Sequence, residues 1–216
     1  ESKFSLGVNV FPNFSMGILS YDESSSSAGE LFKNIETWKP SASTSILVEY
    51  TLKHNAFLGF GLGYQNNGEQ TKKQALIFSI NPTTGEPVYD PYQPSHAKSI
   101  YNHHNLEIPI YYRHLFNNRF YGVFGLSGIV NISNTRTSVL YYPEKATERN
   151  TKNDNSTEFR KINLSTNIGL GFDVIQKENF SFYIQPNAQF GILGLAKSTP
   201  INRNMLSIGI STGIRL

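Results

Sequence analysis

The sequence contains no cysteine, so disulfides, thiolate nucleophiles and cysteine-ligated metals are excluded. Many exported proteins avoid free thiols in an oxidising compartment, and the absence of cysteine is compatible with export. It also lacks the run of about 18 apolar residues that a transmembrane helix needs, so a membrane-spanning form would have to use strands. The opening stretch, ESKFSLGVNV, is what we expect of a mature chain whose export signal has been removed.

Charge of one sign is never gathered into a block. The net charge of +3 comes from 19 basic and 16 acidic residues scattered among Ser- and Asn-rich segments. Basic residues do not interleave with aromatic ones, so we expect no nucleic-acid partner. No cofactor motif is visible, and 216 residues suit a single domain spanning residues 1–216.

Apolar and polar residues alternate with a period of two, which indicates strands. In the first such segment, Phe4, Leu6 and Val8 alternate with Ser5 and Gly7. About eight segments share this pattern, namely residues 3–11, 45–52, 58–64, 106–113, 120–131, 162–173, 182–192 and 206–216. No segment predicts a helix. The expected fold class is all-β.

The connections alternate between short and long. Short turns (KHN, residues 53–55; NNR, 117–119; QKEN, 176–179) follow the second, fourth and sixth strands, whereas residues 21–37, 66–101, 132–160 and 194–204 form long links. This asymmetry is typical of bacterial outer-membrane barrels. It predicts antiparallel strands in up-and-down order, with long extracellular loops and both termini in the periplasm.

The volume of the apolar face indicates which way it points. About thirty bulky apolar residues occupy it, and an eight-stranded barrel is only wide enough to be filled by a few layers of side chains. The apolar face must then point outward, as in an eight-stranded transmembrane β-barrel in contact with outer-membrane lipid. A β-sandwich, which buries a comparable set between two sheets, stays open as an alternative.

Aromatic and proline residues add two further expectations. Aromatics near both ends of the strands suggest interfacial girdles, with Tyr50, Tyr112 and Phe120 toward the short turns and Trp38 and Tyr64 toward the other end. Pro109 and Pro186 fall inside strands, where proline removes a ladder donor, and we expect a bulge at each.

The segment NLEIPIYYRHLFNNRFYGVFGLSGIVN and the closing MLSIGISTGIRL resemble the PorT-like outer-membrane barrels of the Bacteroidota lineage. The resemblance is carried mainly by the run Leu106, Glu107, Ile108 and Pro109, and it extends loosely over all eight strands. Some members of that family serve type IX secretion and gliding. The resemblance therefore implies an outer-membrane location and a structural or accessory role in an envelope complex, with protein partners there.

Four charged residues share the inward-facing parity near the ends of strands two, four, six and eight. They alternate in sign around the expected barrel and are Glu49, Arg113, Asp173 and Arg215. A narrow lumen should bring opposite signs within reach. We predict a buried four-charge network that plugs the lumen, because a buried charge needs a partner. The alternative is that each charge reaches water at the barrel mouth.

The remaining polar and apolar residues allow other functions. A lipid-modifying rim enzyme would need Ser95, His96, His103, His104 and Glu107 to converge, but no motif places them together. Adjacent histidines cannot share a strand face, so no metal site is expected. A small transport or adhesion barrel is the other alternative. Apolar loop residues offer a contact surface for a partner: Leu76, Ile77, Phe78, Val139, Leu140, Tyr141 and Tyr142. The alternative is that they pair within hairpins that extend the strands beyond the membrane, as QALIFSI and TSVLYYP (residues 137–143) suggest.

Overall fold

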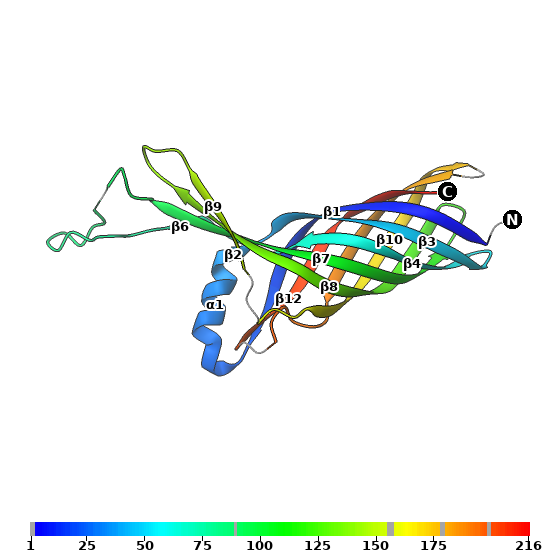
Figure 1. The fold of residues 1–216 in the computed structure, drawn as a ribbon, viewed down its shortest axis with the longest axis horizontal. Coiled ribbons are helices and arrows are strands. Elements are labelled where there is room, and N and C mark those ends of the chain that lie inside the picture. The colour runs from blue at the N-terminus through cyan, green and yellow to red at the C-terminus, as the bar shows by residue number, and fades with distance from the viewer. Residues whose placement is uncertain (1–2, 89, 155–157, 178–179, 198–199) are drawn as a thin grey trace.

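The computed structural model describes residues 3–88, 90–154, 158–177, 180–197 and 200–216. Its main feature is a closed ring of eight antiparallel strands (Figure 1). These are β1 (Phe4–Tyr21), β3 (Lys39–Lys53), β4 (Ala56–Asn67), β7 (His96–Leu115), β8 (Phe120–Tyr141), β10 (Ile162–Lys177), β11 (Phe180–Gly191) and β12 (Ile201–Arg215). Each ring strand pairs with its neighbours along the chain, β1 pairs with β12, and β7 with β8. The ring therefore has no free edge, and the β-sandwich alternative is wrong.

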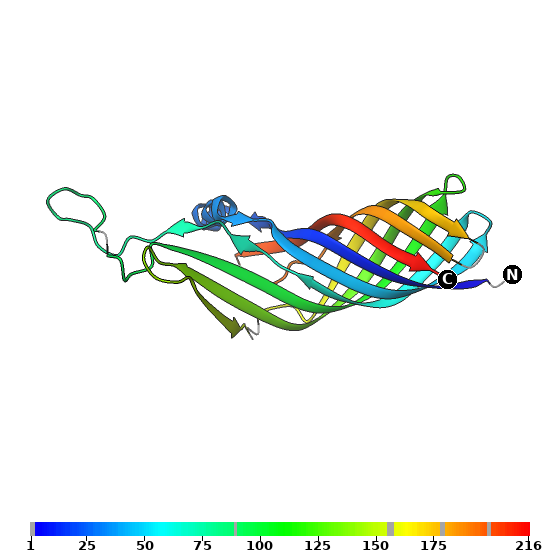
Figure 2. The same ribbon diagram turned by 90° about the horizontal axis from the view of Figure 1, so that it is seen from above.

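The short turns and both ends of the chain lie at one end of the barrel (Figures 1 and 2). The β3–β4 turn consists of His54 and Asn55, and residues 116–119 link β7 to β8. Of the third expected turn, residues 178 and 179 lie outside the described residues. The two described turns have the expected short length.

At the opposite end the strands run further than the alternation indicates. β7 has 20 residues and β8 has 22, about twice the 9–11 that a membrane-spanning strand requires. The assignment of residues 96–101 and 132–136 to loops is therefore wrong, because these segments are parts of β7 and β8. The expectation that residues 137–141 extend a strand beyond the membrane is confirmed, since they pair with residues 96–100 of β7.

Several shorter elements lie at this extended end. They are η1 (Glu23–Ser25), α1 (Ser26–Ile35), β2 (Glu36–Thr37), β5 (Gln70–Thr71), β6 (Gln74–Ala75) and β9 (Glu148–Asn153). β6 pairs with β7, and β9 pairs with β8 (Figure 1). The extension thus continues the sheet of the barrel beyond the ring, along β7 and β8.

The helix α1 corrects the expectation that the chain has no helix. It lies against the end of β1, where a Cβ on Gly29 would come within 2.3 Å of the Tyr21 ring. Only glycine permits this approach. Among the described residues, no helix is both long enough and apolar enough to span a membrane.

The ring presents apolar side chains outward and polar ones inward. Phe60 is 49% exposed and Ile168 is 62% exposed, whereas Gln65 and Ser127 are almost fully buried. At the short-turn end, outward aromatic rings pair across strands, as in Phe120 with Phe172 at 4.7 Å. A soluble protein would bury this apolar band, so its natural environment is lipid.

Neither strand proline causes a bulge. Pro109 stays in register opposite Ser127, and Pro186 stays opposite Ile210. On the side that faces β4, Phe60 pairs with Ile110 and the next pair is Gly63 with Glu107, in the same register. The backbone N–H that Pro109 lacks falls in the local gap between these two pairs. The expectation of bulges was wrong: Pro109 and Pro186 keep the register, and the missing donor of Pro109 falls where the ladder is interrupted on one side.

Candidate functional site

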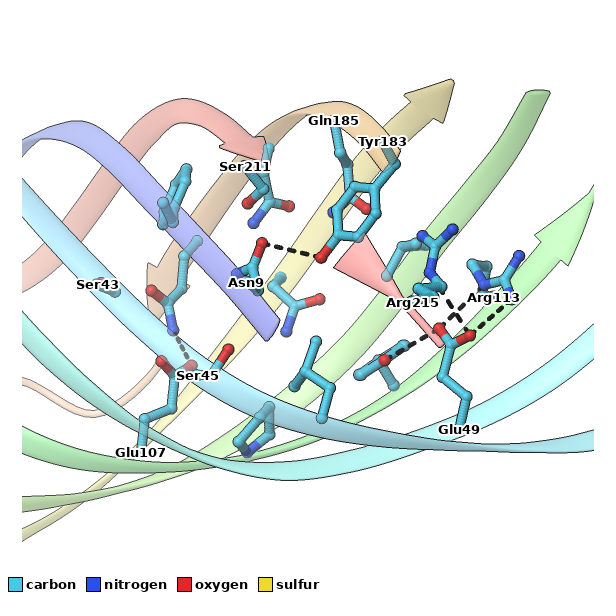
Figure 3. A pocket seen from close by; sticks show the side chains of 18 residues that line it. Asn9, Ser43, Ser45, Glu49, Glu107, Arg113, Tyr183, Gln185, Ser211 and Arg215 are labelled. Carbon is cyan, nitrogen blue, oxygen red and sulfur yellow. Dashed lines mark hydrogen bonds and ion pairs between the residues drawn. The ribbon is translucent and has the colours of Figure 1, made fainter. Parts of the chain in front are cut away.

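Three of the inward charges, Glu49, Arg113 and Arg215, meet in the lumen (Figure 3). Glu49 of β3 and Arg113 of β7 form a bidentate ion pair, with Arg113 Nη2 2.6 Å from Glu49 Oε2 and Arg113 Nε 3.0 Å from Glu49 Oε1. Both side chains are about 95% buried. A two-point contact of this kind fixes the direction of both groups as well as their separation.

Arg215 of β12 joins this pair to the fourth charge. Its Nη1 lies 2.8 Å from Asp173 Oδ1, and its Nε lies 3.6 Å from Glu49 Oε2. The structure therefore brings Glu49, Arg113, Asp173 and Arg215 into one continuous network across the lumen. Two acids and two bases balance each other, as a buried set requires.

Three tyrosines enclose the network, and the sequence reasoning missed them. Tyr111 donates its hydroxyl hydrogen to Glu49 Oε1 at 3.0 Å, and Arg215 Nη2 donates to the Tyr121 hydroxyl oxygen at 2.8 Å. The Arg215 guanidinium also lies 4.1 Å from the centre of the Tyr183 ring. The rings exclude water and add cation–π contacts, which strengthens the ion pairs.

Each tyrosine ring lies over a glycine of the neighbouring strand. Tyr111 is in register with Gly59, Tyr121 with Gly171 and Tyr183 with Gly213. A Cβ on Gly59 would lie 2.1 Å from the Tyr111 ring, and one on Gly171 would lie 2.0 Å from the Tyr121 ring. The inward glycine rows were visible in the sequence, and they were the available signal for these large partners.

A second polar layer crosses the lumen toward the other end. Gln65 Nε2 donates to Gln189 Oε1 at 2.5 Å, and Gln189 Nε2 donates to Glu107 Oε1 at 2.8 Å and to the Ser165 hydroxyl oxygen at 3.0 Å. Asparagines continue the chain of contacts, beginning with Asn67, which donates to Gln65 Oε1 at 3.2 Å. The layer consists of uncharged amides, the Ser165 hydroxyl and one carboxylate, and these groups donate and accept hydrogen bonds among themselves.

Only a small cavity remains between the charge network and the amide layer. Its volume is about 80 Å³, and both Glu49 and Glu107 line it (Figure 3). This space is large enough for several waters, since about 10–15 Å³ of such volume holds one. Among the described residues, the lumen is thus crossed by side-chain contacts at two levels.

The residues weighed for a rim enzyme do not converge. Ser95 and His96 contact each other at 3.0 Å at the start of β7, but Glu107 lies eleven residues further along that strand, roughly 35 Å away. His103 points into the barrel and His104 points out, where its Nδ1 meets the Tyr64 hydroxyl at 2.5 Å. No group of three metal-ligating side chains occurs among the described residues.

The apolar residues proposed as a contact surface divide between two environments. Val139 is only 1% exposed, so it is covered by the protein itself and its place in that surface is wrong. Leu140 and Tyr141 lie within β8, and Tyr142 directly follows it. Ile77 and Phe78 are 60% and 58% exposed, and with Leu76 they line a hollow of about 230 Å³ in the 76–95 segment.

Comparison with known proteins agrees with this architecture. A family described as outer membrane protein beta-barrel domain matches residues 2–197. Solved structures that resemble the chain include Neisserial surface protein A (12% identity, TM-score 0.44, covering 100% of this chain and 97% of that one) and the Ail attachment invasion locus protein of Yersinia pestis bound to sucrose octasulfate (9%, 0.42, 100% of both). The N-terminal β-barrel domain of Pseudomonas aeruginosa OprF is 7% identical, with a TM-score of 0.35 and 97% coverage of both.

No curated protein sequence matches the chain. The family match covers most of its length and includes seven of the eight ring strands. The chain therefore belongs to the outer membrane protein beta-barrel domain family.

Proposed function

We propose that the protein is a non-enzymatic, non-conducting barrel that anchors a binding platform in the outer membrane. One observation carries the proposal: side-chain contacts cross the lumen at two levels, while β7 and β8 continue far beyond the apolar band. A barrel that cannot conduct and that extends a sheet into water is suited to binding other envelope components.

The finer proposal is an accessory subunit of an envelope complex, as in PorT-like barrels. Its support is the resemblance carried by Leu106 to Pro109 together with the extended sheet. In this arrangement the short turns and both termini face the periplasm, and the extension with α1 faces outward. Ser95, His96 and Glu107 do not form a catalytic group, which supports a role without catalysis.

Purified protein in planar lipid bilayers is expected to give no stepwise conductance in concentrated KCl, because ions would have to displace the Glu49–Arg113 pair and the Gln65–Gln189 layer. A water-filled porin studied in the same bilayers provides the positive control. Reproducible conductance steps that scale with the amount of inserted protein would contradict the non-conducting role.

The binding platform is tested by shortening it. We expect that replacing residues 76–94 with a short Gly–Ser link leaves the barrel folded, because the ring strands are untouched, but removes proteins that co-purify from outer membranes with the unaltered protein. The matched control shortens residues 144–147, which lie in the link between β8 and β9 and do not line the hollow of the 76–95 segment. Loss of the same proteins from both variants, or from neither, would argue against the 76–95 segment as the binding element.

A further inference from the structure

A separate cavity lies at the extended end, between α1 and the opening of the barrel. Its volume is about 470 Å³, far larger than the cavity inside the lumen. This lies within the usual range of small-molecule pockets, about 300–1,000 Å³. Its walls come from distant parts of the chain, including α1, β5, β7 and the start of β12.

Two buried carboxylates and one guanidinium form its polar side. Arg203 Nε lies 3.2 Å from Glu36 Oε1 and 3.7 Å from Glu69 Oε1, so both acids lie beside one nitrogen atom. Glu36 Oε2 and Glu69 Oε2 are buried and have no hydrogen-bond partner. Glu69 as a whole is only 6% exposed. Unpartnered buried acceptors are costly, and a ligand that donates hydrogen bonds would satisfy them.

The protein's own donors do not fill these positions. His103 Nε2 is 3.7 Å from Glu69 Oε2, too far for a hydrogen bond, and its Nδ1 is held by Asn134 Oδ1 at 2.7 Å. Lys39 does not line the cavity and donates instead to the Ser41 hydroxyl oxygen at 3.0 Å. Both carboxylates line the cavity, and each keeps one buried oxygen without a hydrogen-bond partner.

Charge in the cavity wall favours a cation. Three of the ionisable lining residues are acids (Glu36, Glu69 and Glu158) and one is a base (Arg203). Burial raises the pKa of Glu36 despite its contact with Arg203. Burial likewise pushes the pKa of Glu69 upward, but His103, Arg203 and Lys39 together hold it below its usual value. A second cation would stabilise both carboxylates in their charged form.

The remaining walls are apolar and aromatic. Phe32, Tyr101, Phe159, Leu195 and Ile201 line them. The Phe32 ring already lies 4.9 Å from the Arg203 guanidinium, so a cation is tolerated beside this ring. Such walls accommodate the apolar part of a ligand. A bare metal ion fits less well, because no cluster of three ligating side chains is found in the described part of the chain.

We propose that this cavity binds a primary amine with an apolar body, whose ammonium group donates to Glu36 Oε2 and Glu69 Oε2 while the body packs against the aromatic walls. The site does not depend on the envelope partner proposed above. An ammonium group is a donor with three hydrogens and no acceptor, which matches a site whose vacant positions are both acceptors.

The test compares three ring compounds that differ only in their polar group. 4-Fluorobenzylamine, 4-fluorobenzyl alcohol and 4-fluorobenzoate are titrated against the purified barrel in detergent micelles and followed by fluorine NMR, with empty micelles as the blank. We expect the amine to bind at least tenfold more tightly than the alcohol, and the benzoate not to bind. Equal affinity for all three would overturn the proposal.

Variants locate the binding. Glu69→Gln and Glu36→Gln should each weaken amine binding at least tenfold, whereas the matched control Glu30→Gln, at an exposed position of α1, should leave it unchanged. Ala28→Trp fills the cavity from α1 without touching a ring strand, and it should abolish binding even if the glutamate variants fail to fold. Full amine affinity in Ala28→Trp would place the ligand elsewhere and overturn the site.

Discussion

Replacing Arg113 with alanine is expected to destabilise the barrel by about 3–5 kcal/mol, because the change leaves a buried carboxylate without its bidentate partner. Glu49 would keep the hydrogen bond from Tyr111 and the longer 3.6 Å contact with Arg215, which Asp173 also engages, but no directly paired charge. Urea unfolding in detergent, followed by the fluorescence of the single tryptophan, Trp38, measures the loss. The matched control is Arg119→Ala, an exposed arginine in the adjacent turn, which should change stability little.

Neutralising the whole network should cost less than removing Arg113 alone. In the combined variant Glu49→Gln, Arg113→Gln, Asp173→Asn and Arg215→Gln, no uncompensated charge remains and the side chains keep similar volumes. Replacing a buried ionic set as a whole is often close to neutral, since desolvation of the charges is avoided. A combined variant that is less stable than Arg113→Ala would show that the ion pairs themselves supply net stability.

Arginine at position 168 is expected to destabilise the barrel by about 2–4 kcal/mol, the cost of a charge on the lipid face near the membrane midplane. Ile168 is 62% exposed in the middle of β10, between Phe124 of β8 and Ala188 of β11. Its outward direction places the new guanidinium in hydrocarbon. Refolding yield into lipid vesicles and the shift in gel mobility on boiling report the effect.

Two controls separate the effect of depth in the membrane from the effect of side-chain size. Ile168→Leu keeps the apolar surface and should fold as the unaltered protein does. Ile162→Arg changes a residue that is 71% exposed at the first position of β10, nearer the interface, and should cost only about 0–1 kcal/mol. Equal folding of Ile168→Arg and Ile168→Leu would mean that the apolar face does not contact lipid.

The sequence alone determined the spanning strands, their two faces and the alternation of short and long connections. These features depend on a period of two, which is local: a residue such as Ile168 or Asp173 faces outward or inward according to its parity. The inward parity of Glu49, Arg113, Asp173 and Arg215 followed from the same rule. The volume of the apolar face then sufficed to choose between a filled interior and a lipid-facing surface.

Features that depend on contacts across the ring were decided only by the tertiary structure. The pairing of β7 with β8 over their whole length depends on contacts between distant segments, and α1 is held by the docking of Gly29 on Tyr21. Glu36, Glu69 and Arg203 meet although more than 130 residues separate the last two. Parity tells which way a side chain points, but the register and closure of the whole ring decide which side chains it meets there.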